Sequence, residues 1–138
     1  MKVKATILVD PQSKGRPRST IKNNKILVYT PHNTAWAEVL IRTSLAKFPD
    51  MFGAKIPLKV KVIFYKLKPK STSKKILFPV TRPDLDGHIR LLLDACQKYV
   101  FPDDAAVVTI EARKRFGSPP RIELIIEEEK EGIGDSNK

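Results

Sequence analysis

Five aspartates lie in the segment from Thr81 to Asp104, TRPDLDGHIRLLLDACQKYVFPDD, within a chain that is otherwise strongly basic. Asp84 and Asp86 stand two residues apart at the start of a helical pattern, and Asp103 and Asp104 follow its end. Carboxylate oxygens are the ligands that hard divalent cations prefer. Side chains of this kind, if they converge, would bind Mg²⁺, or Mn²⁺ in its place.

Convergence depends on how the chain returns after the helix. Residues two apart on a regular helix point to different sides, so Asp84 and Asp86 converge only if Asp84 is still extended. The helix then runs about 15 Å from Asp86 to Cys96, at 1.5 Å per residue. The connection over residues 97–104 spans roughly 25 Å when extended, at about 3.3 Å per residue, which is enough to bring Asp104 back. The spacing permits a three-carboxylate cluster and does not require it.

An ordinary helix start explains the same residues without a metal. Aspartate is a favoured N-cap residue, so Asp84 could cap the helix, and Asp86 could pair with Arg90 four residues later. Asp103 and Asp104 stand between a proline and a strand pattern, where aspartates are more often plain turn residues. In the metal interpretation, Arg90 would instead contact the substrate, at the scissile phosphate of a phosphodiester. Spacing alone leaves both interpretations open.

The other residues that could do chemistry are expected to be structural. We expect His88 to be exposed on the helix, Asp94 to face solvent or support the ligands, Cys96 to be buried, and Trp36 to lie in the core. One cysteine excludes an intramolecular disulfide, and two histidines far apart exclude a Cys/His zinc site. A reducing cytoplasm fits this composition.

The charge balance indicates a polyanionic partner. The 138 residues include 26 Lys+Arg and 15 Asp+Glu, a formal charge of +11. Residues 128–138 hold four acids and two bases with little to bury, so they are predicted to form an acidic disordered tail, and residues 1–127 then carry +13. Such an excess destabilises a compact fold by self-repulsion and is typical of nucleic-acid binding. No basic amphipathic helix points to a membrane surface.

Two basic stretches are candidates for phosphate contacts. Residues 10–29 are predicted to form a loop with at most a short hairpin around Ile26 to Tyr29, and residues 69–83 form a second loop. A metal beside such a surface would hydrolyse phosphodiesters. The candidate DNA-binding residues are Lys14, Arg16, Arg18, Lys22, Lys70, Lys74 and Lys75.

The hydrophobic pattern predicts one α+β domain over residues 1–127, with a mixed sheet of roughly four or five strands and two main helices. One helix begins near Thr30 with Pro31 at its first position, and the other covers Leu85–Cys96. The first helix is expected to bury the face formed by Trp36, Val39, Leu40 and Thr43. Alternating residues predict strands over residues 2–9, 56–68, 105–116 and 121–128.

Several motifs together resemble one family. RPDLDGHIRLLLDA, FPDDAAVV and ARKRFGSPPRIELII, with KGRPR and YTPHNT nearer the N-terminus, are similar to the RusA-type endodeoxyribonucleases. These enzymes are Holliday-junction resolvases often carried by prophages. The resemblance covers Val3 to Glu127, and the combination of D-x-D, amphipathic helix and D-D is more specific than any single piece.

The resemblance implies a Mg²⁺-dependent homodimer that binds four-way DNA junctions in recombination and repair and nicks two opposed strands symmetrically. By position, the essential acids are Asp84, Asp86 and Asp104, with Asp103 as an adjacent metal ligand. Arg90 stands where the family has a lysine, and a guanidinium cannot give up its proton. Gly87 stands where the family commonly has asparagine, which removes an amide beside the metal.

Two other functions fit the same sequence. A non-catalytic nucleic-acid-binding protein would use its aspartates to cap and salt-bridge a helix. A metal-dependent nuclease for flaps or other branched DNA would use the same acids on another substrate.

Overall fold

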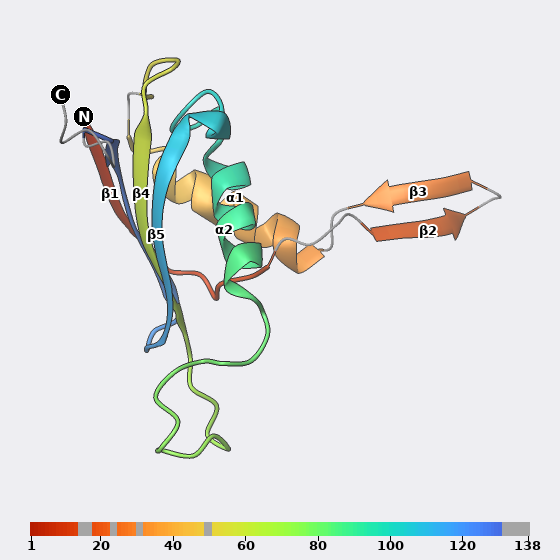
Figure 1. Ribbon diagram of the computed structural model, residues 1–138. Helices are drawn as coiled ribbons and strands as arrows, with labels where there is room; N and C mark the ends of the chain where they lie inside the picture. Colours follow the sequence, from red (N-terminus) through yellow and green to blue (C-terminus); the bar gives the residue numbers. More distant parts are fainter. Residues whose placement is uncertain (14–17, 23–24, 30–31, 49–50, 131–138) are drawn as a thin grey trace.

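The computed structural model describes residues 1–13, 18–22, 25–29, 32–48 and 51–130, and within them a four-stranded mixed sheet has two helices on one side (Figure 1). This confirms the predicted single α+β domain. Neither helix in this part of the chain is long and apolar enough to cross a membrane. The strand order is β1 (Lys2–Ile7), β6 (Arg121–Glu128), β4 (Leu58–Lys66) and β5 (Val107–Phe116), and the helices are α1 (His32–Leu45) and α2 (Leu85–Cys96).

A separate two-stranded sheet lies in the first basic stretch. Only the backbone of its two strands is described. β2 (Arg18–Lys22) pairs antiparallel with β3 (Lys25–Tyr29), with Arg18 opposite Tyr29 and Lys22 opposite Lys25. The hairpin is therefore longer than the short one predicted around Ile26 to Tyr29. Threonine and isoleucine in β2 and isoleucine, valine and tyrosine in β3 have the high strand propensity that this pairing requires.

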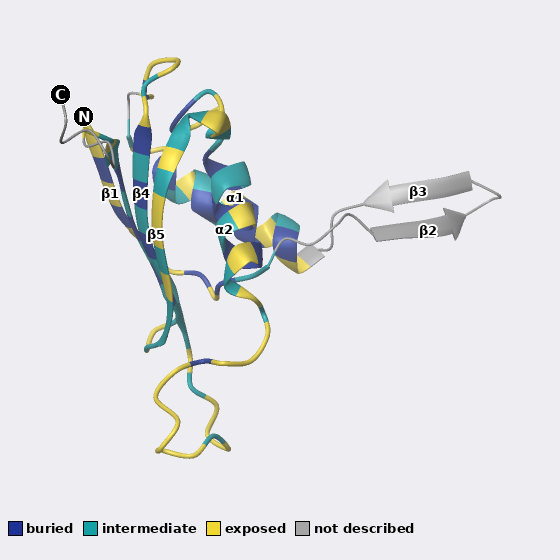
Figure 2. Ribbon diagram, viewed as in Figure 1, coloured by how far each residue is buried: buried dark blue, intermediate teal, exposed yellow. Residues whose placement is uncertain are grey.

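The helices cover the apolar face of the sheet, and alternation explains why. Each of the three strands β1, β4 and β6 buries every second residue, as expected for a sheet with one covered face. Buried segments alternate with less buried ones along the strand ribbons (Figure 2). The core residues from these strands are Val3, Ala5, Ile7, Leu58, Val60, Val62, Phe64, Ile122, Leu124 and Ile126.

The pairing of β4 with β5 determines where α2 begins. These strands are parallel, from Leu58 opposite Val107 to Lys66 opposite Phe116, whereas β6 pairs antiparallel with both β4 and β1. A parallel pair needs a crossover connection, and α2 lies in that connection. The start of α2 therefore lies at the sheet edge where β4 and β5 end (Figure 1).

Helix α1 buries a different face from the predicted one. Trp36 is 58% exposed and Val39 is 47% exposed, whereas Ala37, Ile41 and Leu45 are buried. These three residues are spaced four apart, so they form one stripe along the helix. The prediction was wrong because it gave weight to the large aromatic side chain. The buried stripe includes the small Ala37, and α1 contacts α2 and β1.

Helix α2 has the predicted bounds, but His88 is buried rather than exposed. Its accessible surface is 0%, and its ring stacks on Phe64 with a centroid separation of 5.0 Å. Nδ1 donates to the carbonyl oxygen of Gln12 at 2.7 Å. Desolvation lowers the pKa of His88, so the ring is neutral at pH 7. Cys96 is buried as predicted, and burial raises the pKa of its thiol to about 12.

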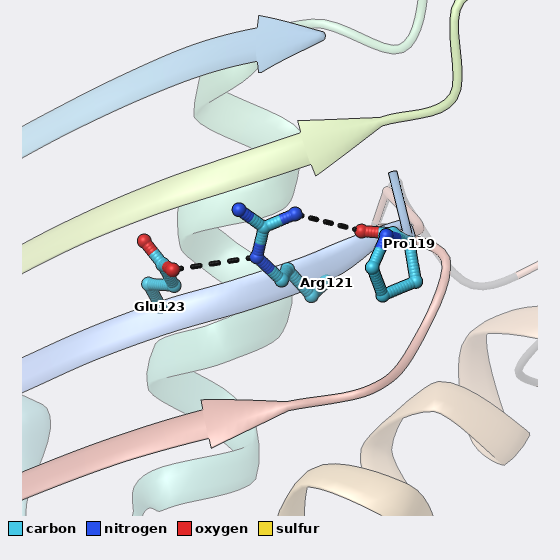
Figure 3. Close-up of polar contacts among 3 residues, drawn as sticks. All are labelled: Pro119, Arg121 and Glu123. Atoms are coloured by element: carbon cyan, nitrogen blue, oxygen red, sulfur yellow. Dashed lines mark hydrogen bonds and ion pairs between the residues drawn. The ribbon is translucent and has the colours of Figure 1, made fainter. Parts of the chain in front are cut away.

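The turn between β5 and β6 is fixed by Arg121. Its Nη1 donates to the carbonyl oxygen of Pro119 at 2.9 Å, and its Nε donates to Oε1 of Glu123 at 3.3 Å (Figure 3). Its guanidinium also lies 3.9 Å from the centre of the Tyr65 ring. These contacts hold the turn and the start of β6 (Arg121–Glu128) against the end of β4.

The C-terminal boundary differs slightly from the predicted tail over residues 128–138. β6 continues to Glu128, and the amide of Glu129 donates to the carbonyl oxygen of Pro57 at 2.8 Å. The first two residues of the predicted tail are therefore held against the sheet domain. Residues 131–138 lie outside the described part of the chain.

Segment 10–13 packs against the first turn of α2, and Gly87 makes this contact possible. A Cβ added at Gly87 would lie 1.9 Å from Oγ and 3.1 Å from Cβ of Ser13. Ser13 is held in turn by Thr34, whose hydroxyl donates to the Ser13 carbonyl oxygen at 3.1 Å. Glycine at position 87 therefore allows segment 10–13 to approach the first turn of α2 closely.

We predict that Gly87→Ala destabilises the protein by about 1–3 kcal/mol, because the new methyl group overpacks this contact. Ser13→Gly removes both clashing atoms, so the double variant should recover most of the loss. Urea unfolding of the four proteins in the cycle measures the coupling. Additive effects of the two substitutions would show that segment 10–13 does not touch Gly87 in solution.

Candidate metal site and nucleic-acid surface

The start of α2 is presented by a long loop over residues 67–83, which follows β4 and extends beyond the edge of the sheet (Figure 1). The end of this loop is attached to β5, because Nζ of Lys114 donates to the carbonyl oxygens of Thr81 at 3.0 Å and Pro83 at 2.9 Å. Ligand sites of open sheets commonly form at the carboxyl ends of parallel strands, beside a helix N-terminus. Asp84 and Asp86 enter the structure at this place.

Asp84 stands at the N-cap position of α2 but does not cap the helix. Its backbone is extended, with φ −74° and ψ 150°, and its side chain makes no capping hydrogen bond. The extended backbone is the condition under which Asp84 and Asp86 can face the same side. The capping role considered for Asp84 is therefore not what the structure shows.

Asp84 and Asp86 line the same open depression, of about 390 Å³. Both carboxylates are exposed. Nη2 of Arg90 lies 3.9 Å from Oδ2 of Asp86, and both side chains are more than half exposed, so this ion pair adds little stability. The other residues around the depression are Ser13, Arg82, Pro83 and Gly87. Two acids and two arginines thus share one surface site.

Asp104 lies in a different acidic group. Partial burial raises the pKa of its carboxyl group, and the hydrogen bond and charge of Asp103 and the charge of Asp94 raise it further. Asp94 follows Asp86 by eight residues on α2, about 12 Å along the helix axis at 1.5 Å per residue. Within the described residues, no group of three or more His, Cys, Asp or Glu side chains is placed to hold a metal ion. The three-carboxylate cluster is thus not assembled in this conformation.

The connection after α2 explains the position of Asp104. The amide of Val100 donates to the carbonyl oxygen of Cys96 at 2.8 Å, and the amide of Lys98 donates to that of Phe101 at 2.7 Å. Lys98 has a positive φ of 68°, and Val100 and Phe101 are buried in the core. The chain therefore turns tightly to bury two apolar side chains. An extended connection could reach the start of α2, but this folded one does not span that distance.

Asp103 has a structural partner of its own. Its Oδ1 accepts a hydrogen bond from the amide of Ala105 at 3.1 Å and caps the short helix η1 (Asp104–Ala106). The turn interpretation therefore describes Asp103 in this conformation, and the ion-pair interpretation describes Asp86 with Arg90. Of Asp84, Asp86 and Asp103, only Asp84 does not make the contact that the interpretation without a metal predicts for it.

The predicted phosphate contacts are described in part. Lys70, Lys74 and Lys75 are exposed on the loop over residues 67–83. Lys68 on the same loop donates to the carbonyl oxygen of Ile76 at 2.6 Å, which holds the loop in shape. Lys14 and Arg16 lie outside the described residues, and Arg18 and Lys22 are described only by their backbone in β2.

Sequence reasoning missed two residues beside the site. His88 reaches Gln12, and Lys114 reaches the loop before Asp84. Lys114 had a signal in the sequence, because it continues the alternation of Ile110 and Ala112 with a charge. No comparable signal marks His88.

Two comparisons with known proteins bear on this arrangement. The model of the family "Endodeoxyribonuclease RusA" matches residues 9–127. The chain is also similar to the uncharacterized protein YqaN of Bacillus subtilis (strain 168), with 27% identity over 136 residues, covering 91% of this chain and 96% of the relative. The family match includes all four candidate metal ligands, both predicted basic stretches and the parallel strands β4 and β5. This chain therefore belongs to the RusA endodeoxyribonuclease family.

Proposed function

We propose that this chain is a Mg²⁺-dependent endodeoxyribonuclease that resolves four-way DNA junctions by paired, symmetric nicks, in recombination and repair. The family match over residues 9–127 supports a nuclease. One local observation carries the metal proposal: Asp84 is extended and makes no capping bond, so its carboxylate is available to a ligand beside Asp86.

Asp84 and Asp86 fit a Mg²⁺ site of the kind that substrate completes. Mg²⁺ is usually held by one or two carboxylates together with waters and substrate phosphates. Two exposed carboxylates around an open depression of about 390 Å³ match this donor set and leave room for a phosphate. Bound Mg²⁺ would activate a water molecule and offset the charge on the phosphate; Mn²⁺ is expected to substitute for it.

We propose Asp104 and Asp103 as further ligands on the basis of the family resemblance. In the described conformation Asp104 interacts with Asp94 and Asp103. Its participation would therefore require the connection after α2 to rearrange when DNA binds, or a second ion in the other acidic group. A variant at Asp104 distinguishes its role from that of Asp84.

Cationic side chains around the depression would hold the DNA backbone. Arg82 and Arg90 line the site, and a guanidinium group is a planar donor that matches the oxygen atoms of a phosphate. We propose that the two basic stretches contact phosphates around the branch point, through Lys14, Arg16, Arg18, Lys22, Lys70, Lys74 and Lys75. This charge would attract DNA of any sequence, and the junction would be selected by shape.

A homodimer is the assembly that we propose for paired nicking. A four-way junction has approximate two-fold symmetry, and a dimer with the same symmetry presents two equal sites. Each site would then cut one of two opposed strands. A single-site enzyme would instead produce unpaired nicks.

We predict that Asp84→Asn, Asp86→Asn and Asp104→Asn each lower junction cleavage by at least about a hundredfold, because each loses a ligand charge. Junction affinity should be unchanged or higher, since the substitution removes repulsion toward phosphate. A synthetic mobile junction with Mg²⁺, resolved strand by strand, measures cleavage, and binding is measured in Ca²⁺.

Asp94→Asn is the matched control on the same helix and should have a milder effect. Loss of cleavage at Asp84 and Asp86 with a normal rate for Asp104→Asn would limit the ligand set to the first two acids. Near wild-type cleavage by all three variants would instead favour a non-catalytic nucleic-acid-binding protein. Faster cleavage of a flap than of the junction would favour a nuclease for other branched DNA.

Junction binding should weaken steeply with salt, with a log–log slope of about −0.9 per neutralised phosphate. Replacing Lys70, Lys74 and Lys75 by alanine should make the slope shallower by up to about three such units, and so should replacing Lys14, Arg16 and Arg18. The control removes three charges from the uncovered face of the sheet, at Lys4, Lys61 and Arg113. Equal slopes for all triple variants would place the DNA surface elsewhere.

Divalent metal should stabilise the fold, by about 2.7 kcal/mol at a hundredfold excess over Kd if it binds only the folded state. Asp84→Asn should erase most of the increment in thermal melts at constant ionic strength. Asp104→Asn should raise the metal-free melting temperature at pH 7. The reason is that a raised pKa means that the ionised Asp104 destabilises the folded state at neutral pH, and stability is regained as pH falls.

Melting of the wild type is compared in EDTA and in saturating Mn²⁺, first alone and then with a bound junction. Identical melting temperatures in both comparisons would contradict a metal site in this protein. An increment that requires DNA would show that phosphate completes the ligand set.

A further inference from the structure

We propose that Lys114 is a positioning residue for the candidate site: it holds the backbone that carries Asp84, through the carbonyl oxygens of Thr81 and Pro83. The two hydrogen bonds, at 3.0 and 2.9 Å, attach both ends of the tripeptide that immediately precedes Asp84. The proposal rests on the proposed function for its effect on cleavage. Its effect on the backbone can be measured independently.

The location of Lys114 on β5 supports a dedicated role. It pairs in register with Phe64, which is fully buried on the helix-covered side of the sheet. Ile110 and Ala112 precede it at two-residue intervals on the same side of the strand. Lys114 ends this row as a partly buried residue, and its ammonium group donates to two carbonyl oxygens of the loop.

The start of α2 lacks the support that helices usually have at this end. Asp84 makes no side-chain capping bond, and the first intrahelical bond, from the amide of His88 to the carbonyl oxygen of Asp84, is long at 3.3 Å. Two contacts from outside the helix hold its start instead of a capping bond. Lys114 holds the residues before Asp84 on one side, and Gln12 accepts a hydrogen bond from His88 on the other.

These contacts release the Asp84 carboxylate from a structural task. A carboxylate that caps a helix gives its lone pairs to backbone amides. Here the backbone is fixed by an ammonium group instead, so the same carboxylate can serve a cation without loosening the helix start. Lys114 therefore acts on Asp84 through the loop and is expected to leave DNA binding to other residues.

Inward-facing lysines on edge strands also prevent unwanted strand pairing, and β5 is an edge strand. That role needs the charge but not the two carbonyl contacts. The two explanations therefore predict different behaviour of the loop. Only the positioning role links Lys114 to the mobility of residues 81–88.

The test compares Lys114→Met with Arg113→Met and Lys114→Arg. Methionine keeps most of the aliphatic stem of lysine and loses the donors. Arg113 is the adjacent residue and lines the uncovered face of the sheet, so its variant loses the same charge without touching the loop. Lys114→Arg keeps the charge and offers donors in another geometry, so it should recover part of the function.

Three measurements are made on each full-length variant. Amide hydrogen exchange of residues 81–88 should accelerate at least about tenfold in Lys114→Met and remain normal in Arg113→Met. The Mn²⁺ concentration for half-maximal thermal stabilisation should rise about tenfold. The single-turnover cleavage rate should fall about a hundredfold, with junction affinity equal to that of Arg113→Met.

Normal exchange of residues 81–88 in Lys114→Met would overturn the proposal, whatever happens to cleavage. A rate loss explained entirely by weaker junction binding would also overturn it, because it would make Lys114 a DNA contact. If Lys114→Met does not fold, Lys114→Gln is measured with the same expectations. Failure of the wild type to cut DNA or bind Mn²⁺ would reject the proposed function, and the exchange experiment would still decide the positioning role.

Discussion

The parallel pairing of β4 with β5 is the constraint on which the rest of the structure depends. Parallel neighbours cannot be joined by a tight turn, so a long loop and α2 must carry the chain back across the sheet. This crossover starts its helix at the edge where both strands end. The N-terminus of α2 then lies there together with Asp84, Asp86, Arg82 and Arg90. The parallel pairing of β4 with β5 thus determines where Asp84 and Asp86 lie in this cationic protein.

Local patterns predicted the elements of the four-stranded sheet and its helices because β1, β4 and β6 alternate and α2 has a clear apolar stripe. They failed where the outcome depends on contacts between elements. The face of α1 was misassigned at Trp36, because the packing of a helix on its neighbours is not encoded in its own apolar pattern; the buried stripe includes the small Ala37. The position of Asp104 could not be predicted because chain length sets only an upper limit. Burial of Val100 and Phe101 determines how much of that length is used.

The aspartates of residues 84–104 are divided between the two ends of α2. Asp84 and Asp86 are exposed beside two arginines. Asp104 is partly buried beside Asp94 and Asp103, and its pKa is raised. A cation or a proton at this second group would offset the repulsion between its carboxylates. Identical residue types in one short segment therefore have different electrostatic surroundings.

Ser13 and α1 mark the two attachment points of the first basic stretch. Ser13 lies against Gly87 in the first turn of α2 and accepts a hydrogen bond from Thr34, in the first turn of α1. The β2–β3 hairpin lies between Ser13 and Thr34 in the sequence, and these two residues are in contact beside the candidate site. Charges joined to a surface through a short segment have a high effective concentration there. A phosphate backbone that reaches Asp84 and Asp86 would thus lie close to the cations of the first basic stretch. It would dissociate only when many weak contacts break together.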